Sequence, residues 1–317
     1  MNKATKFSLL LLTTVGLGLL QANRPLTIAI PSAAPTPQKT AKTDTYGPPT
    51  SLALLKDKAV KESSGLAASR SFPGVYWTHN DSGDGPFIYA FDVRGIKGVW
   101  RLSGATARDW EDIAVGPGPS AGTNYLYIGD IGDNRGSRTE IVVYRVPEPE
   151  LSPRSLSKSK AAATAPSEAL RLRYPDGSHD AEALLVHPHT GNIYIVTKVA
   201  FANPEIYEAA APLKTGRTIT LNRVGTLEVP SLLGGIITGG AISPDGRRVA
   251  FCDYMQGYEA VLENASSAFD TIWKRPLVPI SLGSRKQGEA ITYRLDGKAL
   301  LMTSEGSPMP LMQVVRR

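Results

Sequence analysis

A short pattern recurs five times along this 317-residue chain and constrains its fold more than any other feature. Each copy has a polar or small residue, then a short side chain, then an aliphatic residue that starts a strand-like run. The copies begin at Ser64, Glu111, Glu182, Gly240 and Glu289, so they lie 47, 71, 58 and 49 residues apart. Repeats of this length predict structural units that bury their cores against one another.

Strand signals dominate each repeat. From residue 52 onward, short alternating runs of Val, Ile, Tyr and Leu are separated by Gly, Pro and Asp turns, as in VYWTHN, YLYIGD, NIYIV and VAFC. The low-complexity segment 155–169 predicts an exposed insertion with at most one helical turn. Roughly four strands in every 45–60 residues is typical of a propeller blade.

The ends of the repeat region predict how the ring closes. After Glu289 only 28 residues remain, which is room for three strands, and residues 51–56 (SLALLK) supply a fourth. We therefore expect an all-β fold over residues 51–317, a five-bladed β-propeller closed by an N-terminal strand. A six-bladed ring is the alternative.

The N-terminal segment predicts export. Lys3 and Lys6 precede an uncharged apolar run at residues 7–20, which indicates a signal peptide over residues 1–22, with cleavage after Ala22 or Ala34. An uncleaved anchor is the alternative. Residues 23–50 are rich in Pro, Thr and Lys and predict a flexible linker. We expect a bacterial protein of the periplasm or the exterior.

Composition excludes several classes. A single cysteine, Cys252, rules out a disulfide scaffold and a cysteine-based zinc site. No later segment reaches 18 consecutive apolar residues, so we expect no membrane span in the mature protein. The net charge of +6 favours solubility and does not indicate nucleic-acid binding. We expect a monomer.

The repeat position predicts a metal site in the channel. First strands of propeller blades line the central channel, so equivalent residues form a ring. Carboxylates converging on one axis repel each other, and a cation removes that cost. Calcium, which prefers six to eight oxygen ligands, is favoured over magnesium. The predicted ligands, with Thr238 standing in for Gly240, are Ser64, Glu111, Glu182, Thr238 and Glu289. Alternatively, the glutamates bind backbone amides and hold the blades together.

Charged residues near the repeat position predict a second ring at the channel mouth. They precede the inner strands or follow the second strands, and a metal below cationic groups suits an anionic small molecule such as a phosphoester. The predicted ligand-binding residues are Lys61, Arg108, Lys198, Lys286, Asn80, Asp81 and Glu305. Ordinary surface ion pairs are the alternative interpretation.

No catalytic template is complete. The sequence GPSAG at residues 118–122 lies in a loop before a strand, whereas a nucleophile elbow follows a strand and precedes a helix. The candidates for acid–base chemistry at the mouth are two histidines and two aspartates, namely His79, His179, Asp130 and Asp253.

The repeats resemble those of a known group. The matches Ser64-Gly65-Leu66, Glu111-Asp112-Ile113, Glu182-Ala183-Leu184 and Glu289-Ala290-Ile291 are similar to the SdiA-regulated family of exported bacterial five-bladed propellers. They are more distantly similar to the esterase-like phytase domain family and the calcium-activated nucleotidases. The resemblance covers most of residues 52–317 and implies a calcium ion in the channel. Gly240 departs from the pattern.

These features favour a binding module with a channel calcium site that takes a small anionic ligand or partner. A calcium-dependent phosphoester hydrolase, phytase-like or nucleotidase-like, is the alternative, and an interaction scaffold that uses blade edges is a third. Whether the protein is an enzyme stays open, because no nucleophile and base can be paired from the sequence.

Overall fold

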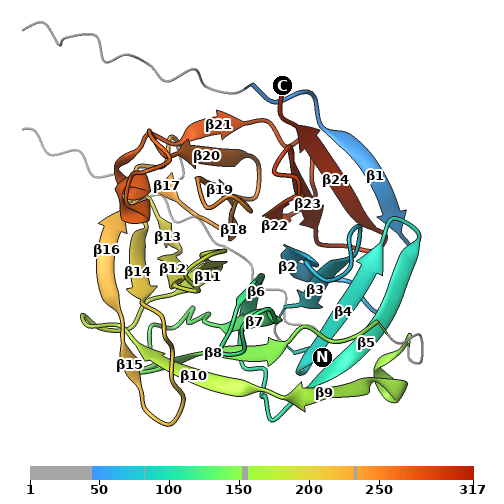
Figure 1. Cartoon of the computed structure of the whole chain (residues 1–317). Coiled ribbons are helices and arrows are strands. Elements are labelled where there is room, and N and C mark those ends of the chain that lie inside the picture. Colours follow the sequence, from blue (N-terminus) through green and yellow to red (C-terminus); the bar gives the residue numbers. More distant parts are fainter. Residues whose placement is uncertain (1–44, 82, 152–155, 232–233) are drawn as a thin grey trace, which may run out of the picture. The chain divides into compact units, whose positions relative to one another are not determined.

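The computed structural model describes residues 45–317 except 82, 152–155 and 232–233. The predicted signal peptide, both cleavage sites and residues 23–44 of the predicted linker lie outside the described residues. The described residues all belong to one compact unit. Within it, the described residues build five antiparallel four-stranded blades arranged around a central axis (Figure 1).

The strands of each blade follow the chain from the axis outward. Blade 1 contains β2 (Ser63–Ala68), β3 (Tyr76–Asn80), β4 (Phe87–Asp92) and β5 (Gly95–Ser103). Blade 2 contains β6 (Trp110–Pro117), β7 (Asn124–Asp130), β8 (Ile141–Pro147) and β10 (Glu168–Arg173). Blade 3 contains β11 (Ala181–Val186), β12 (Ile193–Thr197), β14 (Glu205–Ala209) and β16 (Asn222–Thr226).

The last two blades have the same order. Blade 4 contains β18 (Gly239–Ile242), β19 (Arg248–Cys252), β20 (Gly257–Val261) and β21 (Val278–Ile280). Blade 5 contains β22 (Gly288–Tyr293), β23 (Ala299–Ser304), β24 (Met309–Val315) and, from the other end of the chain, β1 (Thr50–Leu55). The remaining short elements lie in the connections: 3₁₀ turns η1 (Lys158–Lys160) and η2 (Phe269–Lys274), and a two-stranded pair of β13 (Val199–Ala200) and β17 (Gly234–Gly235).

Strand β1 closes the ring. It runs antiparallel to β24, from Thr50 opposite Gln313 to Leu55 opposite Met309, and the two strands lie side by side in Figure 1. Tyr46 extends this pairing through a bridge to Arg316. The predicted five-bladed propeller closed by an N-terminal strand is therefore confirmed, and the described residues leave no sixth blade. Residues 45–49 of the predicted linker belong to this contact region.

Two further strands connect neighbouring blades. Strand β9 (Ala162–Pro166) leaves the connection between β8 and β10 and pairs in parallel with β5 of blade 1. Strand β15 (Ile219–Thr220) leaves blade 3 and pairs in parallel with β10 of blade 2. The insertion predicted at residues 155–169 is largely exposed, as expected, over the described residues 156–166, but it contains a strand that covers the edge of blade 1.

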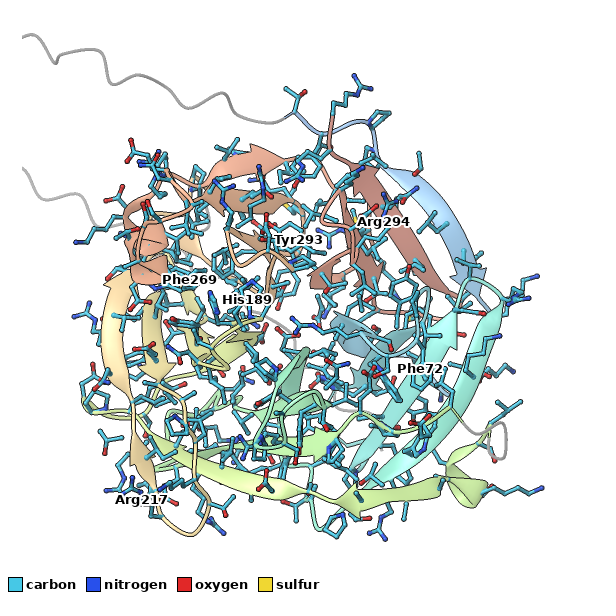
Figure 2. All side chains as sticks on the ribbon, viewed as in Figure 1. Phe72, His189, Arg217, Phe269, Tyr293 and Arg294 are labelled. Carbon is cyan, nitrogen blue, oxygen red and sulfur yellow. The ribbon has the colours of Figure 1, made fainter. Side chains whose placement is uncertain are left out.

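The hydrophobic core lies between the blades. Each of the five apolar clusters among the described residues combines side chains from two neighbouring blades, and these side chains fill the space between the ribbons (Figure 2). Trp77, Trp100 and Trp110 pack between blades 1 and 2, and Trp273 packs between blades 3 and 4. This packing makes each blade depend on both neighbours. Among the described residues, none forms a helix long and apolar enough to span a membrane.

Candidate metal centre

Four inner strands contain a β-bulge at the repeat position. The pairing of β2, β6, β11 and β22 with their second strands skips one residue in each case. The skipped residues, all less than 10% exposed, are Ser64, Glu111, Glu182 and Glu289. A bulged residue leaves the regular alternation of the strand, which re-aims its side chain. The Ser64 hydroxyl and a Glu289 carboxylate oxygen approach to 3.5 Å across blades 1 and 5.

Blade 4 differs because β18 has no bulge. Gly239 and Gly240 pair in regular register with Cys252 and Phe251, so Gly240 is an ordinary ladder residue. Buried Thr238 lies just before the strand and donates a hydrogen bond from its hydroxyl to the carbonyl oxygen of Gly288, at 3.0 Å. The proposed ligand Thr238 thus connects the inner strands of blades 4 and 5.

Glu111 gathers with two aspartates at one end of the channel, here called the mouth. Carboxylate oxygens of Asp81, Asp109 and Glu111 all lie within 4.8 Å of one another. Asp81 follows β3 of blade 1, Asp109 precedes β6 of blade 2, and Glu111 is the bulged residue of β6. The structure therefore brings Glu111 together with these two aspartates, in a group we call the acidic centre.

Gly132 leaves room for the acidic centre. A Cβ atom at this position would lie 2.6 Å from Asp109 Oδ2 and would also collide with the Glu111 carboxylate. Only a glycine therefore lets the loop after β7 approach both carboxylates. The donor set is entirely carboxylate oxygen, which fits a hard cation such as calcium.

The acidic centre is electrostatically costly without a cation. Burial raises the pKa of Glu111 well above its usual value, and the negative charges of Glu182, Asp81 and Asp109 raise it further. The pKa of Asp109 is raised by burial and then by Asp81 and Asp180. Burial and mutual repulsion both penalise the ionised carboxylates, and a bound cation would remove both penalties.

Glu182 has a cation of its own. The ammonium group of Lys198, which follows β12, contacts a carboxylate oxygen of Glu182 and donates a second hydrogen bond to the Tyr254 hydroxyl at 2.9 Å. Burial lowers the pKa of Lys198, but the ion pair with Glu182 outweighs it and raises that pKa, so the lysine stays charged. Lys198, predicted to bind ligand, thus neutralises one of the predicted metal ligands.

Glu289 is held by neutral partners. The side-chain amide of Gln287 donates to one of its oxygens at 2.5 Å, and Ser64 approaches the other. Burial raises the pKa of Glu289, with a further contribution from Asp81. Glu289 therefore lies within the field of the acidic centre while its hydrogen bonds are made inside blades 1 and 5.

Several predicted mouth residues bind the backbone. Asn80 Oδ1 accepts hydrogen bonds from the N–H groups of Lys61 and Glu62 at 2.9 and 3.0 Å. Asp130, at the same place in blade 2, accepts from the N–H groups of Arg108 and Asp109 at 3.1 and 3.2 Å. These side chains fix the segments that lead into the inner strands.

Asp130 and Asp253 are further engaged by side chains. Arg138 donates to Asp130 at 2.8 Å, and both groups are almost fully buried. Asp253 accepts from the N–H groups of Met255 and Gln256, both at 2.7 Å, and from the Tyr258 hydroxyl at 2.6 Å. The carboxylate oxygens of both Asp130 and Asp253 therefore already accept hydrogen bonds from nearby loop residues.

The rim of the mouth carries exposed charges. Lys61, Arg108 and Lys286 are exposed, as expected of groups that could meet a ligand. Glu305 is partly buried after β23, and burial together with the charges of Glu289 and Asp81 raises its pKa to about 7. Acidic groups thus extend from the acidic centre to the rim of blade 5.

The two candidate histidines lie elsewhere. His79 is completely buried, with Nδ1 2.9 Å from the carbonyl oxygen of Asn80 and its ring against Trp110. Burial lowers its pKa, so it is a neutral packing residue near blade 2. His179 belongs to a separate polar cluster with Asp176 and Glu205. Neither imidazole belongs to the acidic centre.

Sequence reasoning missed Asp112. This carboxylate is 1% exposed, and its oxygens accept from the N–H groups of Ile113 at 2.8 Å, Leu184 at 3.0 Å and Gly240 at 3.4 Å. It therefore ties the inner strand of blade 2 to those of blades 3 and 4. The signal was an aspartate where the other repeats have Gly or Ala.

Comparisons with known proteins identify no relative. No family model matches the chain, and no curated protein sequence matches it either. Among solved structures, the propeller of Dos1 aligns over 80% of this chain and 68% of its own, with 10% identity and a TM-score of 0.36. A gluconolactonase from Xanthomonas campestris aligns over 85% of this chain and 89% of its own, with 11% identity and a TM-score of 0.42. Likeness this low says nothing about activity, and the resemblance to the SdiA-regulated and phytase-like families stays a prediction.

Proposed function

We propose that this propeller is an exported binding module that holds calcium at its acidic centre and uses the ion to bind a small anionic ligand. One observation carries the proposal: the oxygens of Asp81, Asp109 and Glu111 lie within 4.8 Å of one another. Export rests on the signal-like residues 1–22, and it would place the site where calcium is available.

The chemistry of the centre favours calcium. Three carboxylates offer up to six oxygens at flexible positions, and calcium accepts six to eight oxygens in irregular geometry. Magnesium demands a tighter octahedron, and zinc prefers nitrogen or sulfur ligands. Asp180 lies close enough to raise the pKa of Asp109, and its Oδ1 accepts from the N–H of Asp133 at 2.7 Å. This hydrogen bond from Asp133 to Asp180 would stabilise the loop that contains Gly132.

The anionic ligand follows from a neighbouring pocket. A cavity of about 230 Å³ opens beside the acidic centre and is lined by Arg108, Asp109, Gly132, Asp133, Asn134, Arg135, Ser137 and Arg138. Arg108 and Arg135 are exposed, whereas Arg138 is engaged by Asp130. An anion in this pocket would contact the guanidinium groups of Arg108 and Arg135. It would also lie near the bound cation, because Asp109 belongs both to the pocket and to the acidic centre.

The cation is a condition for anion binding. Without a cation, the mouth would have a negative field from Asp81, Asp109, Glu289 and Glu305, and that field would repel anions. A divalent ion would be the largest local charge and would reverse that field next to the pocket. The phosphoester hydrolase alternative would use the same ion, but it also needs an acid–base group, and neither candidate imidazole belongs to the acidic centre.

Calcium titration of chelator-treated protein by calorimetry tests the metal site. We expect Asp109→Asn and Glu111→Gln to weaken calcium binding at least tenfold. Gly132→Ala should do the same, because its methyl group displaces both carboxylates. Gly47→Ala is the matched control, since a Cβ atom there meets only ordinary contacts. Wild-type protein that binds no calcium would refute the site.

Phosphate titration with and without calcium tests the ligand. We expect inorganic phosphate to bind only with calcium present, and the double variant Arg108→Gln/Arg135→Gln to lose that binding while calcium affinity is kept. The double variant Lys61→Gln/Lys286→Gln probes the rim, which should contribute less. Equal phosphate affinity in all these proteins would refute the anion pocket. Calcium-dependent hydrolysis of p-nitrophenyl phosphate would establish the enzymatic alternative.

A further inference from the structure

A second polar cluster lies on blade 3, outside the acidic centre. It consists of Asp176 and His179 in the loop before β11, and of Glu205 and Tyr207 on β14, and we call it the blade 3 cluster. His179 Nε2 is 3.0 Å from Asp176 Oδ1 and 3.0 Å from the Tyr207 hydroxyl oxygen. The same hydroxyl is 2.8 Å from Asp176 Oδ2 and 2.5 Å from Glu205 Oε2.

These atoms already have the spacing of metal ligands. One ligand atom each from Asp176, His179 and Glu205 lies within 4.8 Å of the other two. Two carboxylates and one imidazole make a mixed oxygen and nitrogen donor set, which differs from the all-carboxylate set of the acidic centre. Imidazole with carboxylate suits zinc and similar divalent transition metals, whereas calcium takes oxygen alone.

The blade 3 cluster has more close polar contacts than hydrogens to fill them. The Tyr207 hydroxyl carries one hydrogen, yet it faces a carboxylate oxygen of Asp176 and one of Glu205. His179 Nε2 carries at most one hydrogen, and it also faces two oxygens, on Asp176 and Tyr207. Five atoms with lone pairs thus share two hydrogens. A cation bound among them would supply the missing positive charge.

Aromatic rings fix the direction of the imidazole. The Tyr174 ring meets His179 edge-on at 4.9 Å between centroids, and Tyr207 lies 5.2 Å away on another side. Tyr174 and Tyr207 also pack against each other at 4.8 Å. Because both rings are buried, the imidazole is held with Nε2 toward the carboxylates, which lowers the entropic cost of ligation.

The cluster is also open to an incoming ion. The side chains of Asp176, His179 and Glu205 are 42%, 26% and 25% exposed. Arg223, whose side chain is 50% exposed, binds Glu205 Oε1 at 2.6 Å and leaves Oε2 facing the cluster.

We propose that Asp176, His179 and Glu205 form a binding site for a divalent transition metal of the zinc class, independent of calcium at the mouth. Tyr207 is a positioning residue whose hydroxyl lies between the two carboxylates. The site would complete its coordination with water from the open side, since three protein ligands leave a fourth tetrahedral position.

Zinc titration of chelator-treated full-length protein tests the proposal. We expect one zinc ion per chain, with affinity reduced at least tenfold by His179→Ala and, separately, by Glu205→Gln. Glu111→Gln should leave zinc binding unchanged while it weakens calcium binding, and His179→Ala should do the reverse. Loss of zinc in Glu111→Gln together with no effect of His179→Ala would overturn the site.

A second histidine pair, of buried His187 and exposed His189, provides the control. The ring centroids of His187 and His189 lie 5.7 Å apart, and the His187 ring packs against Phe269. Figure 2 labels His189 and Phe269. His189→Asn should leave zinc affinity unchanged, and zinc lost only in this variant would overturn the proposal. Cobalt provides a second readout, because its visible absorption should disappear in Glu205→Gln if the blade 3 cluster holds the metal. Melting temperatures recorded in calcium identify any variant that fails to fold.

Discussion

Glu111 and Asp112 are consecutive residues with opposite surroundings. The bulge in β6 sets Glu111 among other carboxylates at the mouth, whereas Asp112 accepts hydrogen bonds from three backbone N–H groups. The pKa of Asp112 is raised well above its usual value, because the effect of burial outweighs the opposing effect of the three N–H groups. Glu111 therefore belongs to the proposed metal site, whereas Asp112 holds the inner strands of neighbouring blades together.

Replacing Asp112 with Asn tests its structural role. Asparagine keeps one acceptor oxygen and turns an NH₂ group toward backbone donors, so hydrogen bonds to Leu184 or Ile113 are lost. We expect the free energy of unfolding to fall by about 1–3 kcal/mol, the penalty for leaving a buried donor without its acceptor. Urea unfolding measures it. Glu263→Gln, at a side chain that is 68% exposed, should change stability by less than about 0.5 kcal/mol.

The residue types of the site were predictable from the sequence, but their grouping was not. The repeat places Glu111 in the channel, and Asp81 follows from the end of the second strand. Nothing local shows that Lys198 pairs with Glu182, because that contact depends on how two side chains of blade 3 are directed. Nothing local shows that Asp109 completes the acidic centre either, because a loop of blade 1 must meet one of blade 2. The role of Asn80 and Asp130 as backbone acceptors was equally hidden, since polar loop residues look alike in sequence.

At the scale of elements, strand periodicity predicts the blades well. Short apolar runs such as IYIV mark strands that are buried on both faces, as β12 is in blade 3. Strands β9 and β15 could not be predicted, since parallel pairing at a blade edge depends on a neighbour distant in sequence. Both cover an edge that would otherwise expose unpaired N–H and C=O groups.

Removal of β1 tests ring closure. A chain that begins at Asp57 lacks residues 51–56 and exposes the edge of β24, and it loses Leu55 from the cluster between blades 1 and 5. We expect a large fall in melting temperature, measured by calorimetry, because an open ring leaves the outer edge of blade 5 unpaired. A chain that begins at Thr45 should melt like the full chain. Equal melting of all three would contradict closure by β1.

At the scale of the whole molecule, the mouth concentrates buried acid. The pKa values of Glu111, Asp109 and Glu289 are raised by burial first and by neighbouring carboxylates second, and that of Glu305 is raised to about 7. The native state therefore binds more protons than the unfolded chain over the range between the ordinary carboxyl pKa and about 7. Stability falls as pH rises wherever the native state binds more protons.

This linkage predicts that calcium stabilises the protein more at high pH than at low pH. In chelator, we expect the melting temperature to fall as pH rises from 5 to 8. Calcium replaces the protons, so it should raise the melting temperature more at pH 8 than at pH 5. A ligand at a hundredfold excess over its dissociation constant stabilises by about 2.7 kcal/mol. Scanning calorimetry at both pH values measures this, and parallel curves with and without calcium would contradict it.

The closing seam, where β1 pairs with β24, also sets how the ring would respond to mechanical force. Arg317 donates a backbone hydrogen bond to Thr45 at 2.8 Å, and the bridge from Tyr46 to Arg316 follows, so both ends of the described ring leave side by side. Tension applied between them would load these contacts first and then the pairs of β1 and β24 one after another, from Thr50 toward Leu55. Such peeling needs less force than shearing a whole strand at once. The propeller would thus open at one seam, blade 5 first, while β9 and β15 still fasten blades 1, 2 and 3 together.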